Sequence, residues 1–311
     1  MRTTTTTRPR ASATSTTDPA DVLDLLLGPM TYGFMQRGLV AAILVGVVCA
    51  VMGAFVVLRG LAFIGDAVSH AAFPGLVIAY LLGIPLYIGA AVAAVGTALA
   101  IGAVARRGAL RFDTAVGVLF AGTFAFGILL FSTIKGYVSD LFSYLLGNVL
   151  GITFTDIVQV AILGAIVLLV VAILRKELLY ASFDPAGAAA SGLPVHALDY
   201  LLLGLVGVTI VVSIQAVGII MVVAMLVTPA ATGQLLVDKF WDLVKVAIAV
   251  ALVAAVGGLY LSFYLNVASG AAIVLVETVV FGIALLLSPK SGWLGRRRRE
   301  RAALTPQSRT A

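Results

Sequence analysis

Apolar residues in this 311-residue chain come in runs of about twenty, separated by short segments that carry most of the charged residues. A helix of ~20 residues crosses the ~30 Å hydrocarbon core of a bilayer, so the runs predict membrane-spanning helices. The strands of an outer-membrane barrel would instead alternate over about ten residues. The count is nine spans, or eight if the segment around Met221 is re-entrant. The predicted spans are residues 38–58, 66–82, 86–105, 114–134, 156–174, 198–215, 218–237, 243–265 and 270–287.

The two ends of the chain differ from this apolar region. Residues 1–35 are a Thr-, Ser- and Pro-rich tail with a short apolar lead-in, and we expect the tail to be disordered. Residues 36–288 form the predicted transmembrane domain, and residues 289–311 form a basic tail. The apolar segment 137–151 is short and interrupted by Gly147 and Asn148, which is typical of an interfacial or re-entrant piece.

Composition supports a polytopic, all-α membrane protein. Hydrophobic residues make up 61% of the chain and charged residues only 11%, where a soluble domain carries about 25%. This excludes a soluble enzyme with one compact core. The single cysteine, Cys49, lies inside the first predicted span and excludes a disulfide scaffold.

The net charge of +6 does not indicate a nucleic-acid partner, because the basic residues lie between and after the spans. An N-terminus outside and a C-terminus in the cytoplasm place 15 of the 20 Lys and Arg residues on the inner side, as the positive-inside rule requires. The chain contains no GxxxxGK[ST] motif for binding nucleotide phosphates. Any energy from ATP must therefore come from a partner subunit.

The segment GDAVSHAAFPG at residues 65–75 is the strongest candidate site. Asp66 and His70 are four residues apart at the start of a predicted span, so both side chains lie on one helix face. A carboxylate and an imidazole suit Mn, Fe or Zn. The alternatives are that Asp66 caps the helix or pairs with Arg59, and that His70 is a packing residue.

The segment FDPAGAAASGLP at residues 183–194 predicts a short helix on the inner side. Asp184 is the expected N-cap, Pro185 occupies the first turn and Gly192 ends the helix. Small side chains, among them Ala186 and Ala189, would let this helix lie in a groove of another protein. The alternative is an ordinary cytoplasmic loop.

Glu277 lies in the middle of the last predicted span. An ionisable residue inside a membrane helix is a functional candidate by default. Glu277 ranks below Asp66 and His70, because no second ligand lies three or four residues away. We treat it as a secondary candidate for the transport pathway.

Four segments, in this order, resemble the membrane permease subunits of metal-type ABC importers: GDAVSHAAFPG, FDPAGAAASGLPV, VGIIMVVAMLVTPAATGQLL and SGAAIVLVETVVFGIALLL. The resemblance implies the vitamin-B12-permease-like helical bundle of type II ABC importers, in the cell membrane. It also implies a second permease subunit, the same or different, two ATP-binding cytoplasmic subunits and an extracytoplasmic metal-binding protein.

Carried over residue by residue, the resemblance places Asp66 and His70 at the metal site of the translocation path. It places 184–192 on the coupling helix that docks on the ATPase. Glu277 departs from the small or apolar residues of the family, and YLLGNVLGI around Asn148 is similar to the manganese or iron branch rather than the zinc branch.

We therefore expect an ATP-driven permease for a divalent metal ion, manganese before zinc or iron, that is not itself an enzyme and binds no cofactor. Three alternatives remain at this point. A secondary transporter would use Asp66 and Glu277 as proton sites. An ABC permease for a chelate such as a siderophore would need no ligand pair, and a membrane scaffold would transport nothing.

Overall fold

A computed structural model describes residues 27–108, 111–134, 147, 149–219 and 221–288, and every regular element in these ranges is a helix. The all-α prediction is confirmed. The elements are η1 (Pro29–Thr31), α2 (Gly33–Leu58), α3 (Ala62–Leu82), α4 (Leu86–Arg106), α5 (Phe112–Phe131), η2 (Val149–Gly151), α7 (Phe154–Ile173), α8 (Arg175–Phe183), α9 (Pro185–Ala190), α10 (Val195–Val217), α11 (Val222–Leu236), α12 (Phe240–Leu265) and α13 (Ser269–Leu287).

Each of the nine predicted spans coincides with one helix, with ends that agree within five residues. Within the described ranges, eight helices are long and apolar enough to cross a membrane. The ninth, α11, has 15 residues and extends only about 22 Å. It starts late because Gly218, with φ +87°, ends α10. The structure therefore has eight helices of full spanning length, and α11 is a shorter ninth helix that leads from the end of α10 back to the start of α12.

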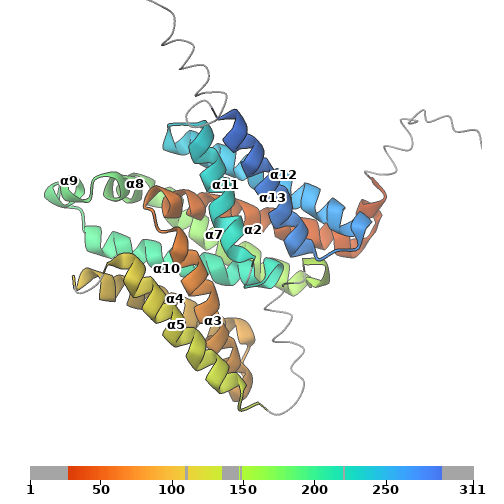
Figure 1. Cartoon of the computed structure of the whole chain (residues 1–311), viewed down its shortest axis with the longest axis horizontal. Coiled ribbons are helices and arrows are strands. Elements are labelled where there is room, and N and C mark those ends of the chain that lie inside the picture. The colour runs from red at the N-terminus through yellow and green to blue at the C-terminus, as the bar shows by residue number, and fades with distance from the viewer. Residues whose placement is uncertain (1–26, 109–110, 135–146, 148, 220, 289–311) are drawn as a thin grey trace, which may run out of the picture.

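The helices form two packed groups that α10 joins (Figure 1). One group consists of α3, α4 and α5, and the other of α2, α11, α12 and α13. Helix α10 contacts α2, α3 and α4, while α7 packs against α2 and α10. The two groups also touch directly where α3 packs against α11, so α10 and the contact between α3 and α11 connect them.

Close helix contacts depend on glycine at a few positions. A Cβ atom added to Gly75 of α3 would collide with the backbone of Gly89 in α4, and one added to Gly89 would collide with that of Gly75. Gly53 of α2 approaches the carbonyl of Leu226 in α11 in the same way. Such contacts stabilise helix pairs in lipid, where no hydrophobic effect draws apolar helices together.

The loops predicted to face the cytoplasm lie together at one end of the bundle. Arg59, at the end of α2, contacts Asp199 near the start of α10. At the same end, the rings of Phe55 and Phe240 lie 4.8 Å apart, which places the start of α12 there. The grouping agrees with the positive-inside rule. The cytoplasmic orientation itself stays a prediction.

Candidate functional site

Asp66 and His70 lie on one face of α3, as their spacing predicts. The N-cap of α3 is Leu61, so Asp66 occupies the second turn and does not cap the helix. That alternative is wrong, because α3 begins four residues earlier than the predicted span. The Nδ1 atom of His70 lies 3.3 Å from the Oδ1 atom of Asp66.

The His70 ring has a defined orientation and tautomer. Its Nδ1 atom lies 3.0 Å from the backbone carbonyl oxygen of Asp66. A carbonyl oxygen only accepts hydrogen bonds, so this contact requires a proton on Nδ1, and the neutral tautomer that makes it has its lone pair on Nε2. The rings of Phe120 and Phe124 in α5 hold the imidazole edge-on, at centroid distances of 5.2 and 5.3 Å. This is the form in which imidazole binds a metal ion.

Asp66 lines a cavity of about 300 Å³ between α3 and α5, and His70 lies one helical turn further along α3. The side chain of Asp66 is 49% exposed and that of His70 is 22% exposed. The cavity contains a second carboxylate, Asp113, which the sequence analysis missed because it directly precedes a predicted span and resembles an ordinary first-turn acid. The lining residues are Phe63, Asp66, Ala67, Asp113, Val116, Gly117 and Phe120.

One chain does not complete a metal site in the described ranges. No group of three or more His, Cys, Asp or Glu side chains gathers there in a way that could hold a metal ion. Asp66 and His70 are therefore two candidate ligands, and their role in metal binding stays a prediction. The remaining ligands of a bound cation would come from water or from another subunit.

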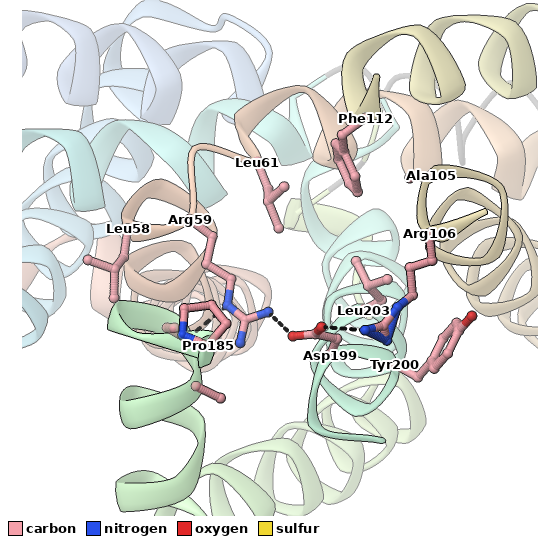
Figure 2. Close-up of a pocket in the computed structure, with 13 residues that line it drawn as sticks. Leu58, Arg59, Leu61, Ala105, Arg106, Phe112, Pro185, Asp199, Tyr200 and Leu203 are labelled. Carbon is pink, nitrogen blue, oxygen red and sulfur yellow. Dashed lines mark hydrogen bonds and ion pairs between the residues drawn. The ribbon is translucent and has the colours of Figure 1, made fainter. Parts of the chain in front are cut away.

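Arg59 does not pair with Asp66, so that alternative is also wrong. Its Nη1 atom lies 2.6 Å from Asp199 Oδ1, and its Nε atom donates a 2.8 Å hydrogen bond to the hydroxyl of Ser182 in α8. Arg106, at the end of α4, lies 3.5 Å from the other oxygen of Asp199. Figure 2 shows Asp199 between the two guanidinium groups.

A cavity of about 400 Å³ adjoins these charged groups. It contains two guanidinium groups and one carboxylate, and the Nη2 atom of Arg59 is buried without a hydrogen-bond partner in the described part of the chain. Sequence reasoning missed Asp199, because an acid just inside a predicted span gave no sign of its two distant partners. The lining residues are Leu58, Arg59, Leu61, Gly102, Ala105, Arg106, Phe112, Ala181, Ser182, Pro185, Asp199, Tyr200 and Leu203.

The predicted short helix is present as α9, which projects from the edge of the molecule (Figure 1). Asp184 caps it by accepting a 2.9 Å hydrogen bond from the backbone of Gly187. Pro185 occupies the first turn, and Gly192, with φ +83°, follows its end. Pro185, Ala186 and Ala189 are exposed. The structure confirms the helix, while docking on an ATPase stays a prediction.

Helix α8, which precedes α9, was not predicted. Its polar start, Arg175 to Glu177, resembles a loop between two apolar runs. The hydroxyl groups of Tyr180 and Ser191 form a 3.3 Å hydrogen bond that connects α8 to the end of α9. The two short helices therefore form one unit outside the long spans.

Glu277 lies in α13, in the other group of helices from Asp66 and His70. Its side chain is fully buried, and neither carboxylate oxygen has a hydrogen-bond partner among the described residues. It is within electrostatic range of Cys49, whose thiol lies 3.1 Å from the hydroxyl of Ser213. The structure does not add Glu277 to the ligand pair, and its pathway role stays a prediction. Asn148, used above to choose the metal, lies outside the described residues.

The sequence is similar to known transport proteins over most of its length. The profile of the ABC 3 transport family matches residues 31–288. The manganese transport system membrane protein MntC of Halalkalibacterium halodurans is 43% identical over 279 residues, which cover 88% of this chain and 96% of that protein. The chelated iron transport system membrane protein YfeD of Yersinia pestis is 43% identical over 265 residues, or 85% of this chain and 89% of that protein.

A solved structure is similar in both sequence and fold. PsaBC from Streptococcus pneumoniae, in complex with a Fab, aligns with a TM-score of 0.79 and 36% sequence identity. The alignment covers 89% of this chain and 99% of the matched chain. The helical arrangement described above is therefore shared with that protein.

Proposed function

Because the chain belongs to the ABC 3 transport family and is a metal-type permease subunit, we propose that it serves an ATP-driven importer whose preferred cargo is manganese. Zinc and iron are the other cargoes that suit its ligands. The observation that carries the proposal is the pairing of His70 with Asp66 on one face of α3, where Nδ1 of His70 lies 3.0 Å from the Asp66 carbonyl oxygen and 3.3 Å from its carboxylate. The names of relatives support manganese or iron.

A nitrogen and oxygen ligand set favours a borderline or hard divalent ion over Cu(I). By the Irving–Williams order the same ligands bind Zn²⁺ more tightly than Mn²⁺. We therefore assign the choice of manganese to the external metal-binding protein that delivers the ion. Weak coordination in the permease suits rapid release.

Two permease subunits complete the site in this proposal. Each subunit supplies one carboxylate and one imidazole, so a pair of subunits supplies four ligands around one cation. The half-exposed Asp66 and the open cavity beside α5 support this arrangement, because they leave the ligands accessible from outside the subunit. The partner is a second copy of this chain or a related permease.

Transport is driven from the cytoplasmic side in this proposal. Two ATP-binding subunits dock on α9, and their closure moves α9 and the helices attached to it. The bundle then opens alternately to each side, and the ion passes Asp66 and His70. The N-terminus lies outside and the C-terminus in the cytoplasm of the cell membrane, which follows from the positive-inside rule.

Uptake of radioactive Mn²⁺ by proteoliposomes that contain the permease, the ATPase and the external protein tests the proposal. We expect uptake that requires ATP and is blocked by vanadate. A proton gradient that drives uptake through this chain alone would contradict the proposal and favour the secondary transporter. Undiminished uptake of the free ion by the double variant Asp66→Ala, His70→Ala would favour the chelate permease, and no uptake by the complete system would favour a scaffold.

A further inference from the structure

Arg59, Ser182, Arg106 and Asp199, here called the ionic cluster, join four different helical elements. Arg59 follows α2, Ser182 belongs to α8, Arg106 ends α4 and Asp199 lies in α10. These side chains connect the short helices α8 and α9 to both groups of long helices.

On one side, the ionic cluster is attached to α9 by a short series of hydrogen bonds. The Tyr180 and Ser191 hydroxyl groups hold α8 to α9. Two residues after Tyr180, the Ser182 hydroxyl accepts from Arg59 and donates to the carbonyl of Leu178 at 2.5 Å. A displacement of α9 is therefore transmitted through α8 to the guanidinium group of Arg59.

On the other side, the ionic cluster is attached to the helices that carry the metal-ligand candidates. Arg59 lies two residues before the N-cap of α3, and the backbone N–H of Leu61 donates to the carbonyl of Val56 at 2.9 Å, which makes the turn a hydrogen-bonded unit. Arg106 ends α4, and the backbones of α4 and α3 are in close contact at Gly89 and Gly75. Both arginines thus act on α3.

The ion pairs of the ionic cluster are partly shielded from water, and a cavity lies next to them. The side chains of Arg59 and Asp199 are only 13% and 28% exposed, so water screens this pair less than the exposed Asp242 and Lys245 pair. Arg59 lines the adjacent cavity of about 400 Å³, and its buried Nη2 atom has no hydrogen-bond partner in the described ranges. A second arrangement of the guanidinium group is therefore sterically available.

We propose that Arg59, Arg106 and Asp199 are positioning residues that transmit the movement of α8 and α9 to α3, and so couple ATP hydrolysis to release of the ion from Asp66 and His70. The inference rests on the proposed function. It predicts that loss of the ionic cluster separates two activities that the intact complex performs together.

The test measures ATP hydrolysis and Mn²⁺ uptake in the same proteoliposomes, for the wild-type complex and for Asp199→Asn. We expect the number of ions taken up per ATP to fall about tenfold, the effect of losing a charge-assisted hydrogen bond in transmission, while the ATPase remains active. Mn²⁺ affinity at equilibrium should stay unchanged. Asp242→Asn, which removes the exposed pair of α12, is the matched control and should keep the wild-type ratio.

A merely structural role would lower both activities together and leave their ratio unchanged, which would overturn the inference. If Asp199→Asn fails to assemble, Ser182→Ala, which removes the hydrogen bond from Arg59 together with the local one to the Leu178 carbonyl, is tested by the same ratio of ions to ATP. A wild-type complex that takes up no Mn²⁺ would contradict the proposed function itself. If the wild-type complex takes up Mn²⁺ and the number of ions per ATP is the same in Asp199→Asn and Ser182→Ala, only the coupling role is contradicted.

Discussion

The Nδ1 atom of His70 lies 3.0 Å from the backbone carbonyl oxygen of Asp66, one helical turn earlier in α3. The neutral tautomer that makes this hydrogen bond has its proton on Nδ1 and its lone pair on Nε2, the atom that we expect to bind the ion. The carboxylate of the same residue, Asp66, lies 3.3 Å from Nδ1. Two candidate ligands of different chemistry, a carboxylate and an imidazole, therefore lie on one short helical segment, and the backbone of that segment itself contacts the imidazole.

Asp113 lines the same cavity as Asp66, and we expect it to attract the cation without being essential. Asp113→Asn should lower Mn²⁺ uptake about fivefold, which corresponds to a loss of about 1 kcal/mol of attraction in a partly solvated site. Uptake at low ionic strength measures the effect. Asp113→Glu, which keeps the charge, should take up Mn²⁺ as the wild type does. If Asp113→Asn takes up as much Mn²⁺ as the wild type, the Asp113 carboxylate does not attract the ion.

The fold was largely predictable because lipid imposes a simple rule. Each span needs about twenty apolar residues. Gly83 and Pro85 separate α3 from α4, and Asn266 ends α12, at positions where the hydropathy pattern also changes. α11 was the exception, since its length depends on Gly218 adopting a positive φ that ends α10. α8 was missed because its polar residues resemble a loop.

The candidate site was predictable only where its residues are neighbours in sequence. Asp66 and His70 are one turn apart, so their spacing alone places them together. Asp199 lies 140 residues from Arg59, and only tertiary packing brings the two within 2.6 Å. An apolar pattern carries no information on such polar contacts between distant segments.

The exposed face of α9 should tolerate little added bulk if it docks on another subunit. We expect Ala186→Trp to reduce co-purification of the ATPase by about tenfold or more, since an indole in a fitted groove costs about 1–3 kcal/mol. Pull-down of the ATPase by the tagged permease measures this. Ala268→Trp, an exposed position between α12 and α13, is the control. Equal recovery of the ATPase with both variants would refute docking on α9.

The contact between Gly75 and Gly89 leaves no room for a side chain. Gly75→Ala should therefore destabilise the protein by about 2 kcal/mol and lower its melting temperature in detergent. Gly96→Ala, where nothing lies within 4 Å of the added methyl group, should be neutral or slightly stabilising. A melting temperature of Gly75→Ala equal to that of Gly96→Ala would mean that α3 and α4 are not in close contact.

Glu277 is a fully buried carboxyl without a hydrogen-bond partner among the described residues, so it destabilises the fold. Replacement by Met, which has similar volume, should raise the free energy of unfolding by about 1–3 kcal/mol. If the residue is retained for transport, Glu277→Met should also lower Mn²⁺ uptake at least about threefold. Thermal melting and uptake measure the two effects, and unchanged uptake would remove Glu277 from the pathway.

Equilibrium binding of Mn²⁺ to the purified permease tests most directly whether Asp66 and His70 hold the ion. The chain contains two histidines, and the second, His196, is exposed at the start of α10, so His196→Ala is a matched control for His70→Ala. Electron paramagnetic resonance of the free ion gives the bound fraction. We expect His196→Ala to bind Mn²⁺ as the wild type does, and His70→Ala to raise the Kd for Mn²⁺ by about 100-fold or more. Equal Mn²⁺ affinity of His70→Ala and the wild type would contradict this expectation.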